Sequence, residues 1–419
     1  MKKILILILV CMSLKVGAQT STFSRVDSLL EQGRYRLVLK QLKSFDTLQD
    51  VANYKIGNVY ASIDNHKKAI EFYKKSLEIN KNFKVELLLG KSYQAIRKDK
   101  KAIEVYQKLL DENPNNLLLG YRLGKLYLKN NQTKAAKNIF EKLIALDAEN
   151  PNYDYQLGLI SARKADGNGM LDNFLNAYKK DSLHVKSIYQ LARTFSLIRK
   201  RDSSKLFTDK GLRLDSLHIN LNKLKINALF RDKKYAKAIE KLKILDALTP
   251  NDLYNKKMLG RSYFNIDSLD LAKENFEAAK KLDKEDFKIL TYLGHIYKAK
   301  KDYRNAMIHY LRATRVGSKE RSEEYYSLAM LYLERKQFTT AIGMLKTAFK
   351  ENQRRHKILY QLALTSDSFY KDKKIAYNLY DDYFMRFEGK DKDITAFVKK
   401  RLKEIKKELF LKGEINKIK

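Results

Sequence analysis

The chain has 419 residues, of which 44% are hydrophobic and 32% are charged, and its formal net charge at pH 7 is +36. This composition supplies enough apolar residues for a large core and excludes a disordered chain. The 3 prolines and 16 glycines are too few for an all-β or loop-rich design, so the composition favours helices joined by short turns.

Residues 1–18 have the order of a secretory signal. Lys2 and Lys3 precede an apolar run over 4–12, and the small residues that follow predict cleavage after Ala18. The run is shorter than the about 20 residues that span a bilayer, although a retained anchor is an alternative. The single cysteine, Cys11, lies in this segment, where its lipidation is a further alternative, so the mature chain would have no disulfide and no cysteine zinc site. We expect an exported protein of the periplasm or cell envelope, without a transmembrane helix in the mature chain.

Residues 83–116 contain the clearest copy of a unit that recurs along the chain. Small, aliphatic and aromatic residues three to four positions apart give each half of the unit one apolar stripe, as expected for two amphipathic helices. The basic stretch 97–101 supplies the turn, and Pro114 ends the second helix because proline lacks the N–H that a continuing helix needs. A single hairpin cannot bury both stripes, so the copies must stack.

Three ladders of residues recur in one register along the chain. The first contains the small residue of the first helix, at Gly57, Gly90, Gly124, Gly158, Ala192, Ile226, Gly260, Gly294, Ala329 and Ala363. A second ladder of mainly tyrosines and a third of alanines run in phase with it. The pattern resembles the tetratricopeptide repeat family, whose 34-residue hairpins show Leu-Gly-x-x-Tyr followed by Ala, an aromatic residue, Ala and Pro. The resemblance implies an all-α, right-handed superhelical solenoid of stacked helix hairpins with a C-terminal capping helix.

The match of each segment to the repeat pattern varies along the chain. A degenerate first hairpin occupies 21–49, clear repeats occupy 50–150, and 253–389 is clear again. Residues 151–252 are weaker repeats, because several of their small or aromatic positions hold polar residues; a hinge between two halves is the alternative. Residues 390–419 form a capping helix and tail, with lysines on the outer face. The predicted hairpins start near residues 21, 50, 83, 117, 151, 185, 219, 253, 287, 322 and 356.

No residue pattern in the sequence indicates a catalytic site or a metal site. The six histidines lie in different repeats without the paired spacing of a metal site. The stretch 166–169 suggests a calcium loop but fails, because Met170 and Leu171 stand where the loop needs a further oxygen ligand and its glycine. Neither a phosphate-binding glycine motif nor a nucleophile elbow is present. We therefore expect no catalytic residue, no metal and no cofactor, and a binding protein rather than an enzyme; an enzyme of unknown class is the remaining alternative.

The resemblance also implies which residues face a ligand, because the first helices of this family line a concave groove. One expected row consists of tyrosines: Tyr54, Tyr121, Tyr155, Tyr189, Tyr326 and Tyr360. The other is basic: Lys91, Lys125, Arg193, Arg261 and His295. Tyrosine and arginine are suited to anchoring a partner, although such tyrosines also pack against the neighbouring repeat. The rows predict a scaffold or adaptor for protein partners in the cell envelope, with an extended or acidic segment held in the groove.

Basic residues are concentrated in the turns inside the hairpins, which lie along one edge of a stack. This predicted basic edge comprises Arg97, Lys98, Lys100, Lys101, Arg199, Lys200, Arg201, Lys233, Lys234, Lys300, Lys301, Lys373 and Lys374. Attachment of this edge to an anionic envelope polymer or membrane surface is the second functional hypothesis. Nucleic acid is disfavoured by the expected export and by the lack of a recognition motif. The simpler alternative is that the chain is rich in lysine throughout, so that lysines occur on every solvent-exposed helix face.

Overall fold

The computed structural model describes residues 23–45, 49–316, 321–412 and 414. These residues form helices and turns, and none of them lies in a β-strand. The predicted all-α fold of helix hairpins is confirmed. Among these residues, no helix combines the length and the apolar character that crossing a bilayer requires. The expected signal segment 1–18, with Cys11, lies outside the described residues.

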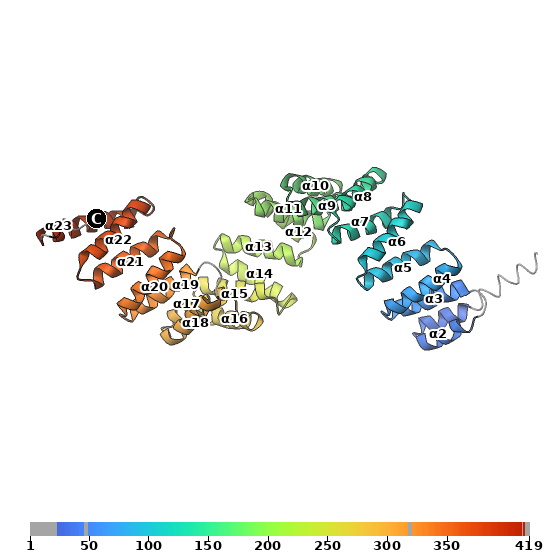
Figure 1. The fold of residues 1–419 in the computed structure, drawn as a ribbon, viewed down its shortest axis with the longest axis horizontal. Coiled ribbons are helices and arrows are strands. Elements are labelled where there is room, and N and C mark those ends of the chain that lie inside the picture. The colour runs from blue at the N-terminus through green and yellow to red at the C-terminus, as the bar shows by residue number, and fades with distance from the viewer. Residues whose placement is uncertain (1–22, 46–48, 317–320, 413, 415–419) are drawn as a thin grey trace, which may run out of the picture. The chain divides into compact units, whose positions relative to one another are not determined.

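The chain divides into two compact units, Met1–Asp215 and Ser216–Lys419. The boundary falls within 151–252, the region of weaker repeats. The first unit begins with a helical segment at 23–31, and its later helices follow one another in pairs (Figure 1). They are α2 (Tyr35–Lys43), α3 (Gln49–Ser62), α4 (His66–Ile79), α5 (Phe83–Ala95), α6 (Asp99–Glu112), α7 (Leu117–Lys129), α8 (Thr133–Leu146), α9 (Pro151–Arg163), α10 (Gly167–Lys180), α11 (Val185–Leu197) and α12 (Arg201–Leu214).

The second unit repeats the same arrangement of helix pairs and ends in one longer helix. Its helices are α13 (Ile219–Arg231), α14 (Tyr235–Leu248), α15 (Leu253–Asn265), α16 (Leu269–Leu282), α17 (Phe287–Ala299), α18 (Tyr303–Val316), α19 (Ser322–Glu334), α20 (Phe338–Glu351), α21 (His356–Phe369), α22 (Lys373–Phe387) and α23 (Lys392–Leu411). Within each unit, the second helix of a hairpin packs against its own first helix and against the first helix of the next hairpin.

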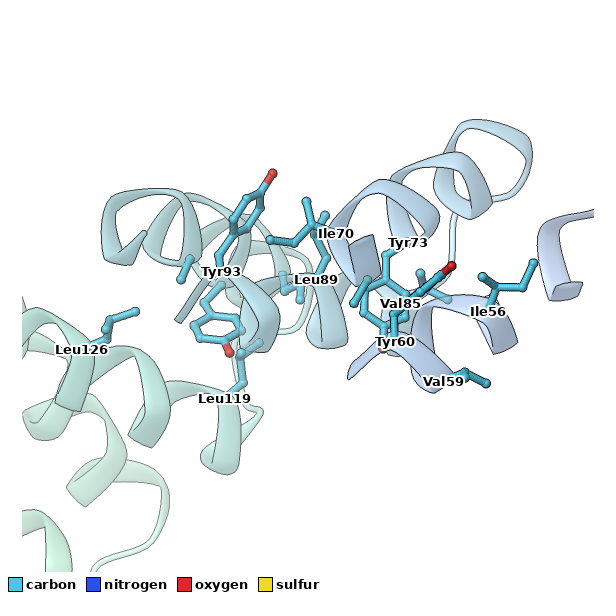
Figure 2. Packing of buried hydrophobic residues seen from close by; sticks show 14 of the residues in the cluster. Ile56, Val59, Tyr60, Ile70, Tyr73, Val85, Leu89, Tyr93, Leu119 and Leu126 are labelled. Carbon is cyan, nitrogen blue, oxygen red and sulfur yellow. The ribbon is translucent and has the colours of Figure 1, made fainter. Parts of the chain in front are cut away.

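The core of the first unit shows why the copies stack. Ile56 of α3, Tyr73 of α4 and Val85 of α5 are 3% exposed or less and belong to one continuous cluster. Figure 2 shows these side chains gathered between consecutive helices. Because the cluster draws on two hairpins, neither could bury its apolar stripe alone.

The glycines of the first ladder allow close approach of an aromatic ring from the second helix. A Cβ atom at Gly90 would lie 2.3 Å from Cε1 of Tyr106, sixteen residues later (106 − 90 = 16). The same pairing recurs at Gly57 with Tyr73, Gly124 with Phe140, Gly158 with Phe174, Gly260 with Phe276 and Gly294 with Tyr310. Ala192 and Ile226 replace the glycine in two of the weaker repeats, where the residue sixteen positions later is Thr208 or Leu242. A larger residue on one helix thus accompanies a smaller one on the other, as dense packing requires.

The two kinds of turn have different local causes. Between hairpins, Asn82, Asn116 and Asn150 cap the following helix, since each side chain accepts a hydrogen bond from a backbone N–H of its first turn. Inside hairpins, one residue adopts the left-handed conformation, which closes the end of the first helix. These residues are Asp64, Arg97, Asn131, Ala165, Arg199, Lys233, Asp267, Lys301 and Lys336, with φ between 57° and 62°.

The last helix, α23, packs on the second unit through apolar residues and a partly buried ion pair. Val398, Ile405 and Leu409 are its buried residues. Arg401 donates to both carboxylate oxygens of Asp367 on α21, over 2.7 and 3.1 Å. Burial raises the pKa of Asp367, but hydrogen bonds from Arg401 and Lys373 outweigh that effect and hold the pKa below its ordinary value.

Candidate functional site

A cavity of about 580 Å³ opens in the second unit on the side built by first helices. All but one of its lining residues come from α13, α15 and α17. The residues are Asn227, Leu253, Tyr254, Lys257, Met258, Arg261, Phe276, Lys288, Ile289 and Tyr292. Residues spaced three to four apart on one helix face the same side, so consecutive first helices supply one continuous wall.

The floor of the cavity is apolar and aromatic. Phe276 and Ile289 are 1% exposed or less. The ring of Tyr292 stacks on Phe276 with centroids 4.8 Å apart. The hydroxyl of Tyr254 donates to Oδ1 of Asn227 over 2.9 Å, and burial raises the pKa of this phenol, which stays neutral near pH 7. The aromatic side chains are therefore held in fixed positions, which reduces the entropy lost when they contact a ligand.

Three basic side chains line the cavity, and only one of them has an acidic partner in the described part of the chain. Lys257 pairs with Asp286, which also caps α17 by accepting from the N–H groups of Lys288 and Ile289. The guanidinium carbon of Arg261 lies 4.4 Å from the ring centre of Phe230, and its Nε is buried with no hydrogen-bond partner in the described part of the chain. Arg261 and Lys288 have no ion-pair partner within the ranges that the structure describes. The cavity thus carries two uncompensated positive charges.

No acidic residue is among the described residues that line this cavity. Its chemistry favours a ligand with an anionic group next to an apolar or aromatic one, because the anion would pair with Arg261 and Lys288. Nothing in the lining has the nucleophile and base of a catalytic site. The described residues also contain no group of three or more His, Cys, Asp or Glu side chains that could hold a metal ion.

Family models describe the repeats themselves. Models of the tetratricopeptide repeat match residues 51–83, 100–158, 258–286 and 288–316. The chain is a tetratricopeptide repeat protein. The matched segments lie in both units, and four of the glycine–aromatic pairs described above fall entirely within them: Gly57 with Tyr73, Gly124 with Phe140, Gly260 with Phe276 and Gly294 with Tyr310.

Comparison with solved structures finds similar chains at low sequence identity. Yeast Tom70 is 15% identical and has a TM-score of 0.42, covering 94% of this chain and 96% of its own. The APC/C hetero-tetramer Cut9-Hcn1 is 13% identical, with a TM-score of 0.45 and coverages of 91% and 95%. PilF of Pseudomonas aeruginosa is 17% identical, with a TM-score of 0.42 and coverages of 49% and 93%. No curated protein matches the sequence. Identities this low say nothing about partners.

The predicted basic row of the tetratricopeptide repeats is divided between the two units. Arg261 lines the cavity described above, and His295 lines a second, shallower depression that also contains Lys301. The imidazole of His295 is hydrogen-bonded to the hydroxyl of Tyr310 over 2.7 Å, and burial lowers its pKa. Lys91, Lys125 and Arg193 are exposed in the first unit. The ammonium of Lys125 lies 5.2 Å from the ring centre of Tyr121.

The predicted tyrosine row is half-buried throughout, since each of its members packs against its surroundings. Tyr121 contacts the rings of Phe140 and Tyr153, and Tyr155 contacts that of Phe174. Tyr360 lies edge-on to Tyr383 and Phe397, and Tyr326 is buried enough for its pKa to be raised. Tyr54 lines a small depression with Lys84, and Tyr189 also has an interaction partner. These tyrosines therefore have contacts within the fold that do not depend on a bound partner.

The residues of the predicted basic edge differ in their charge partners. Lys300 pairs with Asp270, Lys373 with Asp367, and Lys374 with Glu414. The other members are exposed and have no ion pair among the described residues; they are Arg97, Lys98, Lys100, Lys101, Arg199, Lys200, Arg201, Lys233, Lys234 and Lys301. The uncompensated charge is therefore greatest around the turns at 97–101, 199–201 and 233–234.

Several cavity residues were not singled out from the sequence. Tyr254, Lys288 and Tyr292 belong to neither predicted row. Lys257 stands three residues before Gly260, at the position that holds tyrosine in most other repeats. A comparison of the repeats position by position would have marked Lys257 as a change from aromatic to basic. The pocket itself could not be found in this way, because residues of three consecutive first helices form it.

Proposed function

We propose that this tetratricopeptide repeat protein is an interaction scaffold that holds an extended segment of a protein partner. The segment presents an acidic side chain beside an aromatic or aliphatic one. The observation that carries the proposal is the cavity of the second unit, whose aromatic floor lies next to the uncompensated charges of Arg261 and Lys288. A carboxylate there would give Arg261 the acceptor that its buried Nε lacks.

A peptide-binding measurement tests the proposal with the full chain. The probes are fluorescein-labelled ten-residue peptides, one alternating glutamate with leucine and phenylalanine, and one with lysine in place of glutamate. We expect the acidic peptide to bind and the basic one not to. Arg261→Gln should weaken binding of the acidic peptide about ten- to hundredfold, since a hydrogen bond to a charged group contributes about 1.5–3 kcal/mol.

Lys125→Gln is the matched control. Lys125 directly follows Gly124 as Arg261 follows Gly260, but it lies on the first unit outside the cavity. It should leave the affinity unchanged. Equal binding of both peptides, or equal effects of the two substitutions, would reject the cavity as the site of the acidic segment. Circular dichroism of each variant checks that the helices are intact.

We also propose that the protein is exported to the periplasm or cell envelope. The order of charged, apolar and small residues in 1–18 supports this, although that segment lies outside the described residues. Fractionation of cells that produce the full chain tests it, together with N-terminal sequencing. Recovery in the cytoplasm with Met1 retained would reject export.

A further inference from the structure

The sixth hairpin carries an exposed apolar tip that the fold does not need. The tip consists of residues 197–206, at the end of α11 and the start of α12. Leu197 is 65% exposed, Ile198 is 49% exposed and Leu206 is 61% exposed. Single exposed aliphatic residues are ordinary on protein surfaces, but three within one turn and its flanks are a local concentration.

The other repeats act as an internal comparison for these positions. At the position of Leu197, they have Ser62, Ala95, Lys129, Arg163, Arg231, Asn265, Ala299, Glu334 or Ser368. At the position of Leu206, one of them has the apolar Ile308, and the others have a polar residue or glycine, at Glu71, Glu104, Asn138, Asp172, Glu240, Glu274, Gly343 and, in a hairpin one residue longer, Asn378. Most of the other hairpins therefore form with small or polar residues at both places, so the packing of the fold does not require the leucines of the tip.

The charges of the tip are as distinctive as its apolar side chains. Arg199, Lys200, Arg201 and Lys205 are exposed and have no ion-pair partner within the described residues. Asp202 is the one acidic residue of 197–206. The ten residues thus contain three aliphatic and four basic side chains, with one acidic side chain.

The backbone and the core hold this tip in a fixed shape. Arg199 has φ 61°, and the amide of Lys200 donates to the carbonyl of Phe195 over 2.9 Å, which closes the turn. Directly beneath it, the rings of Phe195 and Phe207 stack with centroids 5.6 Å apart. Leu206 consequently points away from the core that its neighbour Phe207 occupies.

We propose that this tip docks on an anionic lipid bilayer. Leu197, Ile198 and Leu206 enter the boundary between headgroups and acyl chains, and the four basic side chains contact lipid phosphates. A bilayer surface accepts aliphatic and basic groups without a specific geometry, whereas a protein partner would use a pocket or aromatic anchors. None of the cavities described above lies at this tip.

Sedimentation with lipid vesicles tests the proposal on the full chain. The vesicles contain phosphatidylcholine alone or phosphatidylcholine with phosphatidylglycerol. We expect binding to the anionic vesicles and little to the zwitterionic ones. Leu197→Ser combined with Leu206→Glu should reduce the bound fraction about tenfold or more, since it removes the apolar contacts. Lys200→Gln combined with Arg201→Gln should reduce it about fivefold for each charge removed.

Ile308→Glu is the matched control, because Ile308 occupies the position of Leu206 in the ninth hairpin and is 44% exposed. It should leave vesicle binding unchanged. The proposal is overturned if the wild-type chain ignores anionic vesicles, if the tip variants bind as well as wild type, or if Ile308→Glu weakens binding as much as they do. Retention on immobilised polyglutamate that the tip variants abolish, without vesicle binding, would instead assign the tip to an acidic protein.

Discussion

The substitution Gly90→Ala tests the packing rule on which the stack depends. The added Cβ atom would lie 2.3 Å from Cε1 of Tyr106 and 2.9 Å from its Cδ1 and Cζ. Ordinary carbon–carbon contacts begin near about 3.5 Å, so the ring would have to move by about 1.2 Å. Tyr106 is fully buried, and its hydroxyl donates to Oε1 of Gln94 over 2.8 Å, so little free space is available for that movement.

The expected change in the free energy of unfolding is the sum of two costs and one gain. Overpacking a well-filled core costs about 1–3 kcal/mol, and a weakened hydrogen bond costs about 1 kcal/mol. Replacing glycine by alanine inside a helix recovers about 1 kcal/mol. We therefore expect Gly90→Ala to lower the free energy of unfolding by about 1–3 kcal/mol, although alanine is the better helix former.

Gly343→Ala provides the matched control. Gly343 is exposed in the helix α20, and nothing lies within 4 Å of the position that its Cβ would occupy. This substitution should raise the free energy of unfolding by about 1 kcal/mol, because only the helix propensity changes. The double variant Gly90→Ala with Tyr106→Leu should be less destabilised than the sum of its single changes, since Ile226 coexists with Leu242 in the seventh hairpin.

Urea unfolding followed by circular dichroism measures the global effect. Long repeat arrays need not unfold in one step, so hydrogen exchange of peptides from α5, α6 and α20 locates each change. Faster exchange should appear in α5 and α6 of the Gly90→Ala chain, and slower exchange in α20 of the control. If both glycine substitutions stabilise the protein equally, the reasoning from close ring contact is wrong.

Further predictions concern the capping helix and the turns. Asp367→Asn should weaken the docking of α23 by about 2 kcal/mol, because the charged acceptor of Arg401 is lost, and hydrogen exchange in α23 should become faster. Since the folded-state pKa of Asp367 is lowered, its stabilisation is complete above the ordinary aspartate pKa of about 4 and is lost as the pH falls through the lower folded value. Acid should thus release α23 in wild type, and that pH dependence should be absent from Asp367→Asn. Lys233→Gly should raise the free energy of unfolding by about 1 kcal/mol, because φ 57° strains a residue with a Cβ atom, while Gly33→Ala, at φ 69°, should lower it by a similar amount; equal urea midpoints for both would contradict this.

The repeat pattern made the fold predictable. Each small residue of the first ladder has a fixed place on its helix, so the recurrence of Gly90, Gly260 and Gly294 specified hairpins before any contact was known. The turn at 97–101 and the helix end at Pro114 were predictable for the same reason, and α6 indeed begins at Asp99 and ends at Glu112. Local interactions of this kind depend on sequence neighbours alone.

The candidate site was only partly predictable. Arg261 was named from the sequence, but the cavity around it also needs Tyr254 and Tyr292, which lie on consecutive first helices. The basic edge shows the same limit. Lys300 pairs with Asp270, thirty residues away, so its charge is compensated only once two hairpins have stacked. A count of charged residues in the sequence cannot show that such a lysine is paired with an acidic residue.

The sequence by itself determined the helices, their pairing into hairpins and the order of the hairpins, because these follow from periodicity within about 34 residues. The tertiary structure alone decided which side chains meet between neighbouring hairpins. It opened the cavity beside Arg261, compensated some basic residues and left Leu197 and Leu206 exposed. The physical reason is that burial and charge pairing depend on distances between residues of different repeats, and a one-dimensional pattern does not contain those distances.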